Sequence, residues 1–185
     1  MAISLQRNRV FLATPTAEGE NEFLDAVFGS EALHHPWVFP PRTHEQYLGY
    51  LERIKIGRTI SNLVRLTAGN QLAGVINLSE PVMGIFQSAY LGFYAFAGCE
   101  RQGLMTEGLA LVLDRAFNEL GFHRLEANIQ PANAASAALV RRLGFRNEGF
   151  SPKYLFIDGA WRDHDRWAIL SDEWPARRDQ LFASR

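Results

Sequence analysis

Cysteine and long apolar runs are both scarce in this sequence. Cys99 is the one cysteine among 185 residues, which excludes a framework of disulfide bonds within the chain and is consistent with a reducing, cytoplasmic environment. No run of about 18 apolar residues occurs, so we expect no segment that spans a membrane. The first residues lack a basic region followed by an apolar stretch, so we expect no secretory signal.

An excess of either charge is also absent. The 19 basic and 20 acidic residues give a net charge of −1. Broad binding of nucleic acid requires many contacts from basic groups to phosphates, so we expect no nucleic-acid partner. Lysine is rare, because 17 of the 19 basic residues are arginine. A compositional bias of the source genome explains this, and a dedicated anion site is the alternative because the arginine fork matches anions.

Internal repeats and low-complexity tracts are lacking, so we predict a single domain over residues 1–185. A hydrophobic fraction of 47% is enough for a core and excludes general disorder. Residues 34–41, HHPWVFPP, are expected to form an extended loop, packed on the core or facing a substrate. Its aromatic residues Trp37 and Phe39 would contact the substrate or a second copy of the chain, which leaves a monomer and a homodimer open.

The first half of the chain reads as strands and helices that alternate. Helical spacing and a Thr43 cap predict two helices, and an Ala-Gly-Asn-Gln turn at 68–71 predicts an antiparallel hairpin. The expected strands cover residues 8–14, 62–67, 72–78 and 88–95, and the expected helices cover 17–28 and 44–56.

The second half gives a more definite pattern. Apolar residues at three- and four-residue steps predict a helix over 106–120, and Asn133 caps a second helix that ends at Gly144. Residues 124–130 alternate between apolar and polar side chains, as in a strand with one buried face. Two or three strands follow at 146–150, 154–157 and 161–170, with a hairpin turn at Asp158-Gly159. The whole pattern predicts a mixed sheet with helices on its faces.

The turn of residues 100–108, ERQGLMTEG, lies between a predicted strand and a predicted helix. Gly103 would let the backbone approach a ligand, and the first amides of the helix have no partner within it. These amides and the helix dipole would favour an anion. The G-x-G-x-x-G pattern of dinucleotide-binding folds and the lysine-containing phosphate loop are both absent. Spacing alone also permits a plain strand–helix turn.

Two motifs in this half resemble the GNAT acetyltransferase superfamily. Residues 100–105, ERQGLM, resemble its acyl-CoA motif R/Q-x-x-G-x-G/A, and residues 133–145 resemble N-x-x-S-x-x-L followed by K/R-L-G-F. Residues 102–107, 121–126 and 157–164 are similar to the RimJ/RimL-type branch, which acetylates the N-termini of ribosomal proteins. The resemblance covers about 90–170. It implies the α+β GNAT fold, an α/β/α sandwich whose mixed, mostly antiparallel sheet has about six to seven strands.

This resemblance implies acetyl-CoA as co-substrate. Its pyrophosphate would bind the backbone amides of Gln102, Gly103, Leu104, Met105 and Thr106. Glu100 stands where the superfamily has Gln or Arg, so we expect it to turn to solvent, with Arg101 compensating. Backbone groups of Phe93, Tyr94 and Ala95 would pair with the pantetheine amides, and Asn133 and Ser136 would contact the same arm. The cap of a helix is the other reading of Asn133.

Such enzymes act by direct attack of an amine on the thioester, so no nucleophile is needed and Cys99 is expected to be structural. Glu126, on the polar face of its strand, is the candidate base. Its alternative is a surface carboxylate paired with Arg124, Arg141 or Arg142. Ser136 would protonate the departing thiolate, unless its hydroxyl bonds helix backbone, and Tyr154 is the second candidate acid. The tyrosine acid of other branches is replaced by Val140.

The expected acceptor is the α-amine of a protein N-terminus, of ribosomal-protein type. This amine has an ordinary pKa of about 7.7–8.0 and so needs only a modest base. The mixed charges of residues 32–58 favour a peptide over a polycation. The alternatives are a small amine such as an antibiotic, polyamine or amino acid, an acyl-CoA-binding module without turnover, and an unrelated nucleotide-binding protein. The histidines lack the spacing of metal ligands, so we expect no metal.

Overall fold

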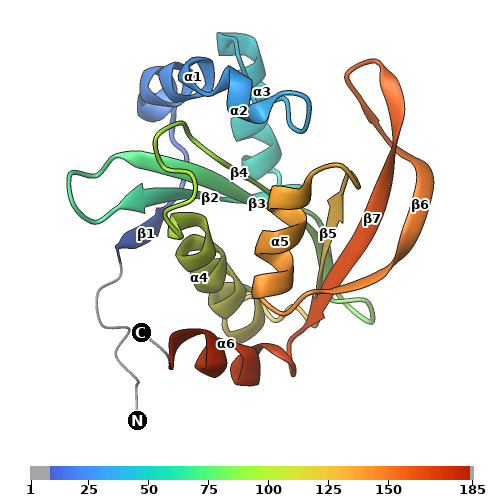
Figure 1. Cartoon of the computed structure of the whole chain (residues 1–185). Coiled ribbons are helices and arrows are strands. Elements are labelled where there is room, and N and C mark those ends of the chain that lie inside the picture. Colours follow the sequence, from blue (N-terminus) through green and yellow to red (C-terminus); the bar gives the residue numbers. More distant parts are fainter. Residues whose placement is uncertain (1–8, 184–185) are drawn as a thin grey trace.

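A single mixed sheet organises the computed structural model, which describes residues 9–183 (Figure 1). The strands are β1 (Val10–Ala13), β2 (Thr59–Leu66), β3 (Leu72–Val82), β4 (Ser88–Ala95), β5 (Arg124–Ile129), β6 (Arg146–Ile157) and β7 (Ala160–Leu170). They lie in the order β1-β2-β3-β4-β5-β7-β6. Neighbouring strands are antiparallel except β4 and β5, which are parallel. The predicted fold class is therefore confirmed.

Helices cover both faces of this sheet (Figure 1). The first three helices follow β1, the fourth and fifth flank β5 in the sequence, and the sixth follows β7. Their bounds are α1 (Glu20–Gly29), α2 (Glu31–His34), α3 (His44–Lys55), α4 (Leu104–Asn118), α5 (Ala134–Arg142) and α6 (Trp174–Phe182).

Adjacent residues of β3 show how the sheet separates two apolar cores. Ile76 belongs to the larger cluster, which includes Leu109 of α4. Its neighbour Val75 belongs to the second cluster, with Phe23 of α1 and Tyr47 of α3. Successive side chains of a strand point to opposite faces. The α4–α5 layer and the α1–α3 layer therefore pack on opposite sides of the sheet.

Most predicted elements of the second half are confirmed. β5 buries alternate residues as expected, and Asp158 and Gly159, both at positive φ, form the turn between β6 and β7. Asn133 caps α5, because its Oδ1 accepts a hydrogen bond from the Ser136 amide at 3.1 Å. Thr43 caps α3 in the same way, accepting from the Gln46 amide at 3.3 Å.

The structure differs from the prediction at several element boundaries. The predicted helix over 17–28 opens with a 3-10 turn at Ala17–Gly19 before α1 begins. The predicted strands over 146–150 and 154–157 are one strand, β6, with an irregular pairing to β7 between Ser151 and Leu155. His34, placed in the loop by the prediction, ends the short helix α2. Residue 8, the start of the first predicted strand, lies outside the described residues.

The helix α6 was not predicted, because its own apolar pattern is weak. It is held by tertiary contacts instead. Trp174 is 1% exposed, and its Nε1 donates to Asp114 Oδ1 of α4 at 2.8 Å. Arg178 donates to the other oxygen of Asp114 at 2.9 Å. These hydrogen bonds hold α6 against α4.

Candidate active site

The parallel strands β4 and β5 pair over a short distance only. Their register joins Ser88 to Arg124, Ala89 to Leu125 and Tyr90 to Glu126, and no pair follows although both strands continue. The strands therefore part after Tyr90 and Glu126. Beyond that point β4 still pairs with β3 on its other side, up to Ala95. The β5 side of β4 is left without a strand partner over its last five residues, 91–95.

The turn after β4 leads directly into the N-terminus of α4. Gly103 is the residue before the helix, with φ +77°, and Arg101 also has positive φ, at +59°. The first hydrogen bond of the helix runs from the Glu107 amide to the Gly103 carbonyl at 3.1 Å. The amides from Leu104 to Thr106 precede it and have no partner within the helix. They form a positive end that would suit an anion.

The side chains around this turn leave its amides uncovered by negative charge. Glu100 is exposed, as expected for a carboxylate that would otherwise repel an anionic ligand. The Gln102 side chain donates to the Gly98 carbonyl at 2.6 Å and so fixes the turn. The carboxylate of Glu107, in the first helical turn, pairs with Arg9.

Met105 is accommodated by a glycine on a neighbouring strand. Met105 is 8% exposed. A Cβ built at Gly74 of β3 would overlap its Sδ and would lie 2.6 Å from the Tyr94 carbonyl oxygen. Gly74 therefore leaves room both for the Met105 side chain and for the backbone of β4. The Met105 departure from the acyl-CoA motif is compensated in this way.

The free edge of β4 carries alternating backbone groups. The Phe96 amide donates to Ala73 of β3, so the backbone groups of Phe93 and Ala95 point away from β3, and those of Tyr94 point toward it. His34 Nε2 hydrogen-bonds the Ala95 carbonyl at 2.8 Å. Burial lowers the pKa of His34, which keeps the ring neutral. Phe93 and the Ala95 amide then remain as the backbone groups that face the opening between the strands.

Asn133 and Ser136 lie together at the start of α5, both partly exposed. The Asn133 side chain caps the helix through the Ser136 amide, so the structural reading of Asn133 is correct. Its contact with acetyl-CoA stays a prediction. Within the described residues the Ser136 hydroxyl forms no hydrogen bond, so the expected alternative, a bond to helix backbone, is not formed.

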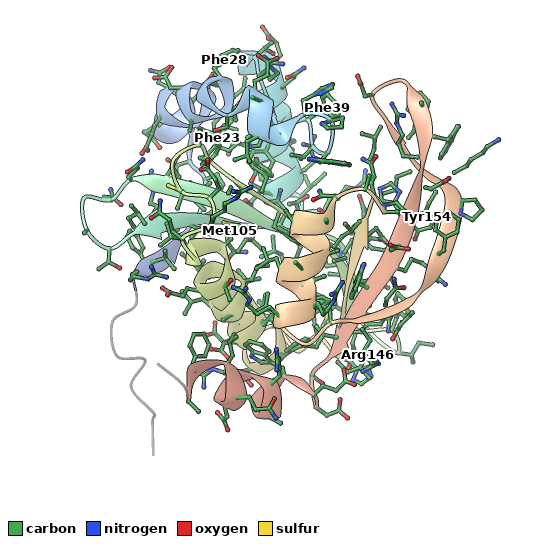
Figure 2. All side chains as sticks on the ribbon, viewed as in Figure 1. Phe23, Phe28, Phe39, Met105, Arg146 and Tyr154 are labelled. Atoms are coloured by element: carbon green, nitrogen blue, oxygen red, sulfur yellow. The ribbon has the colours of Figure 1, made fainter. Side chains whose placement is uncertain are left out.

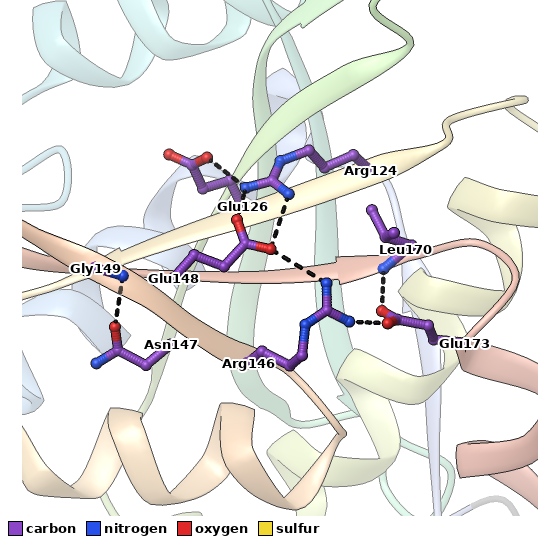
Figure 3. Close-up of polar contacts among 8 residues, drawn as sticks. All are labelled: Arg124, Glu126, Arg146, Asn147, Glu148, Gly149, Leu170 and Glu173. Atoms are coloured by element: carbon purple, nitrogen blue, oxygen red, sulfur yellow. Dashed lines mark hydrogen bonds and ion pairs between the residues drawn. The ribbon is translucent and has the colours of Figure 1, made fainter.

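Glu126 belongs to a chain of charges on the face opposite α4 and α5 (Figure 3). Its Oε2 accepts from Arg124 at 3.0 Å, and the same guanidinium binds Glu148 of β6. Glu148 also accepts from Arg146, which pairs with Glu173. The Glu126 side chain remains 15% exposed. The alternative reading, a carboxylate paired with Arg124, is thus observed, and the role as base stays a prediction.

Tyr154 lies on the β6–β7 hairpin (Figure 2), close enough to Glu126 for the two groups to interact electrostatically. Its ring centroid is 6.1 Å from that of His164. Burial, then a hydrogen bond with Tyr90 and the charge of Glu126, raise the pKa of Tyr154 to about 12. Its phenol therefore stays protonated through the neutral range. Glu126, Tyr90 and Tyr154 meet where β4 and β5 part, whereas Ser136 lies on the α5 side.

Cys99 is structural, as expected. It is 3% exposed, and its Sγ lies 3.9 Å from the Leu72 carbonyl oxygen. Burial raises the pKa of its thiol, which disfavours the nucleophilic thiolate.

Among residues 9–183, no group of three or more His, Cys, Asp or Glu side chains is placed to hold a metal ion. In the same part of the chain, no helix is long and apolar enough to cross a bilayer.

Comparison with known proteins decides the family. The model described as "Acetyltransferase (GNAT) domain" matches residues 9–146. The chain belongs to the GNAT acetyltransferase family. The open edge of β4 and the amides at the start of α4 are therefore the expected place for acetyl-CoA, which GNAT acetyltransferases use.

Relatives of known sequence carry acetyltransferase names. The chain is 33% identical over 124 residues to "Probable N-acetyltransferase YjcK" of Bacillus subtilis, covering 67% of this chain and 68% of that protein. It is 38% identical over 108 residues to the "[Ribosomal protein uS5]-alanine N-acetyltransferase" of Escherichia coli, covering 58% of this chain and 56% of that one. The chain thus matches little more than half the length of the second relative.

Solved structures show the same fold. RimJ of Mycobacterium smegmatis, in complex with CoA-disulfide, superposes with a TM-score of 0.84 at 26% identity, over 95% of this chain and 90% of that one. The spermidine N-acetyltransferase of Vibrio cholerae, in complex with CoA and spermine, gives a TM-score of 0.78 at 19% identity, over 91% and 99% of the two chains. The second likeness concerns the fold alone.

Sequence reasoning missed two residues near the opening, Tyr90 and His34. No sequence motif marked Tyr90, because its position beside Glu126 follows from the register of β4 against β5. His34 was considered as part of the 34–41 loop and as a metal ligand, and its contact with Ala95 joins residues 61 positions apart.

Proposed function

We propose that this GNAT enzyme transfers the acetyl group of acetyl-CoA to the N-terminal α-amine of a protein, of ribosomal-protein type. The observation that carries the proposal is the parting of β4 from β5 beside the N-terminus of α4. The diphosphate would bind the amides of residues 102–106. The pantetheine arm would then run along β4 toward the point where Tyr90 and Glu126 still pair. The thioester would then lie beside Glu126 and Tyr154.

The acceptor ammonium must lose two protons, one before and one after the attack, and the departing sulfur must gain one. Glu126 accepts a proton from the acceptor ammonium, directly or through water, and the amine nitrogen attacks the acetyl carbonyl carbon. The new C–N bond forms, the nitrogen loses its second proton to solvent, the C–S bond breaks, and the sulfur leaves as a thiolate. Tyr154 donates the proton to that sulfur and regains one from solvent. Ser136, the donor that the sequence favoured over Tyr154, remains the alternative, because its hydroxyl is not engaged by the helix.

The charges near Glu126 favour an acceptor with a single amine. Arg124 already neutralises Glu126, and Arg166 lies close enough to Tyr154 for its charge to offset part of the rise in the pKa of that phenol. A polyamine, with several positive charges, would be repelled by this arginine. The name of the Escherichia coli relative, an alanine N-acetyltransferase of ribosomal protein uS5, supports the same acceptor class.

Mass spectrometry of acetyl transfer tests the proposal. The protein is incubated with acetyl-CoA and peptides that begin with Ala, Ser or Met, alongside spermidine, an aminoglycoside and free amino acids. We expect one acetyl group on the peptide α-amine, located by fragmentation. Acetylation of a small amine alone would retain the enzyme class and refute the acceptor. Binding of acetyl-CoA with no product from any amine would favour the binding module instead.

A further inference from the structure

Two buried polar atoms on neighbouring strands lack partners. Asn128 Oδ1 and Arg166 Nε form no hydrogen bond within the described residues. The two residues are directly opposite each other in the β5–β7 pairing. One atom is an acceptor and the other is a donor. Leaving each unsatisfied costs about 1–3 kcal/mol, so their persistence points to a partner that the folded chain itself does not supply.

The pair lies on the face that carries the candidate base. Asn128 follows Glu126 by two positions in β5, so both side chains point to the same side, about 7 Å apart along the strand. Arg166 is close enough to Tyr154 for its charge to offset part of the rise in the pKa of that phenol. Beyond Tyr90 and Glu126, the strand β4 no longer covers this edge of β5. Asn128 therefore borders the opening between the strands.

The backbone leaves room for the arginine. Gly149 of β6 is opposite Arg166, and a Cβ built there would lie 3.2 Å from its Nη2. Arg166 forms no ion pair with any residue of the described part of the chain. Both Asn128 and Arg166 keep part of their surface exposed, so a change of side-chain rotamer would present the two atoms to a ligand. The site thus has space for the Arg166 side chain, whose positive charge is not paired with a carboxylate of the described residues.

Resting on the proposed function, we propose that Asn128 and Arg166 bind the first residue of the acceptor. Asn128 Oδ1 accepts a hydrogen bond from the α-amine, and Arg166 Nε–H donates to the carbonyl oxygen of that residue. An α-aminoacyl group offers an N–H and a C=O separated by one carbon, which matches an adjacent acceptor and donor. A polyamine has no carbonyl to bind Arg166. The pair therefore selects α-amines of peptides over simple alkylamines.

The test compares two acceptors and two variants. One acceptor is a peptide that begins with Ala, and the other is the same peptide with its first carbonyl reduced to a methylene. Arg166→Met removes the donor at similar length, and Arg166→Lys keeps the charge without the Nε–H. Arg58→Met, at an exposed arginine paired with Glu80, is the matched control. Titration with acetyl-CoA and thermal melting verify that each variant is folded.

We expect Arg166→Met and Arg166→Lys to lower kcat/KM for the Ala peptide by about 10- to 100-fold, the usual weight of a hydrogen bond from a charged group. The loss should lie mainly in the KM for peptide, with acetyl-CoA affinity unchanged. The reduced peptide should be a poor acceptor for the wild type and equally poor for both variants. Arg58→Met should behave as the wild type.

The outcomes separate this inference from the proposed function. A wild type that acetylates the Ala peptide, with Arg166 variants equally active on it, overturns the Asn128–Arg166 subsite and leaves the function standing. Equal losses on the normal and the reduced peptide overturn it as well, because the carbonyl would then not be the group recognised. A wild type that acetylates no peptide refutes the function and the subsite together.

Discussion

Gly74→Ala should disturb both stability and acetyl-CoA binding. The new Cβ would lie 2.6 Å from the Tyr94 carbonyl oxygen and 3.2 Å from the Ala95 Cα, and would overlap Met105 Sδ. The methionine can move, but the first two atoms are backbone of β4. Overpacking of this kind costs about 1–3 kcal/mol. Because each kcal/mol lowers the Tm by about 2–4 °C in a chain of this size, we expect a Tm lower by about 2–12 °C.

A shift of the β4 backbone should also weaken the binding of acetyl-CoA, since Ala95 belongs to the β4 edge where the pantetheine arm is expected. Differential scanning calorimetry gives the Tm and isothermal titration gives the Kd. Gly49→Ala in α3 is the control, because a Cβ there meets no described atom within 4 Å and the residue lies outside the β4 edge. Adding Met105→Ala should recover part of the Tm but leave the backbone conflict. A Gly74→Ala protein with the Tm and Kd of the wild type would refute this reasoning.

Three further predictions concern the candidate site residues. Asn133→Ala removes the cap of α5 and should lower the free energy of unfolding by about 1 kcal/mol, measured by urea denaturation. It should also raise the Kd for acetyl-CoA. An unchanged Kd would show that Asn133 acts as a cap only. Glu126→Gln should lower kcat, with the loss shrinking as pH rises because the amine is then neutral already; an equal loss at every pH would remove Glu126 as the base. Tyr154→Phe should lower kcat more than Ser136→Ala does. Because the pKa of Tyr154 is about 12, its phenol keeps its proton below that pH. The wild-type kcat should therefore not fall as the pH passes through 10. A fall there that Tyr154→Phe abolishes would contradict the structure.

Local patterns were enough to predict the helices α4 and α5 and the turn between β6 and β7. The three- and four-residue steps over 106–120 and the Asn133 cap are read within one element, and both helices were found. The Asp158-Gly159 turn is equally local. In contrast, α6 depends on Trp174 and Arg178 meeting Asp114 some 60 residues earlier, which no local pattern reports.

The candidate site was predicted by its residues but not by its geometry. Glu126 and Tyr154 were named from their place on strands and from the family resemblance. The point where β4 leaves β5 is set by the register of Tyr90 against Glu126, and this is a property of the whole sheet. The unpaired atoms of Asn128 and Arg166 likewise depend on which residues face each other across β5 and β7. Strand pairing in the folded sheet, which the sequence pattern does not reveal, therefore determines which of these residues lie together.

A crystal structure with a bisubstrate analogue, in which CoA is joined through an acetyl bridge to the α-amine of an Ala peptide, tests the central claim most directly. We expect the diphosphate on the amides of residues 102–106 and the pantetheine along the free edge of β4. The bridge should lie beside Glu126 and Tyr154, with the peptide on the side of the sheet opposite α4 and α5. A diphosphate bound away from the start of α4, or a peptide on the α4–α5 side, would contradict the account.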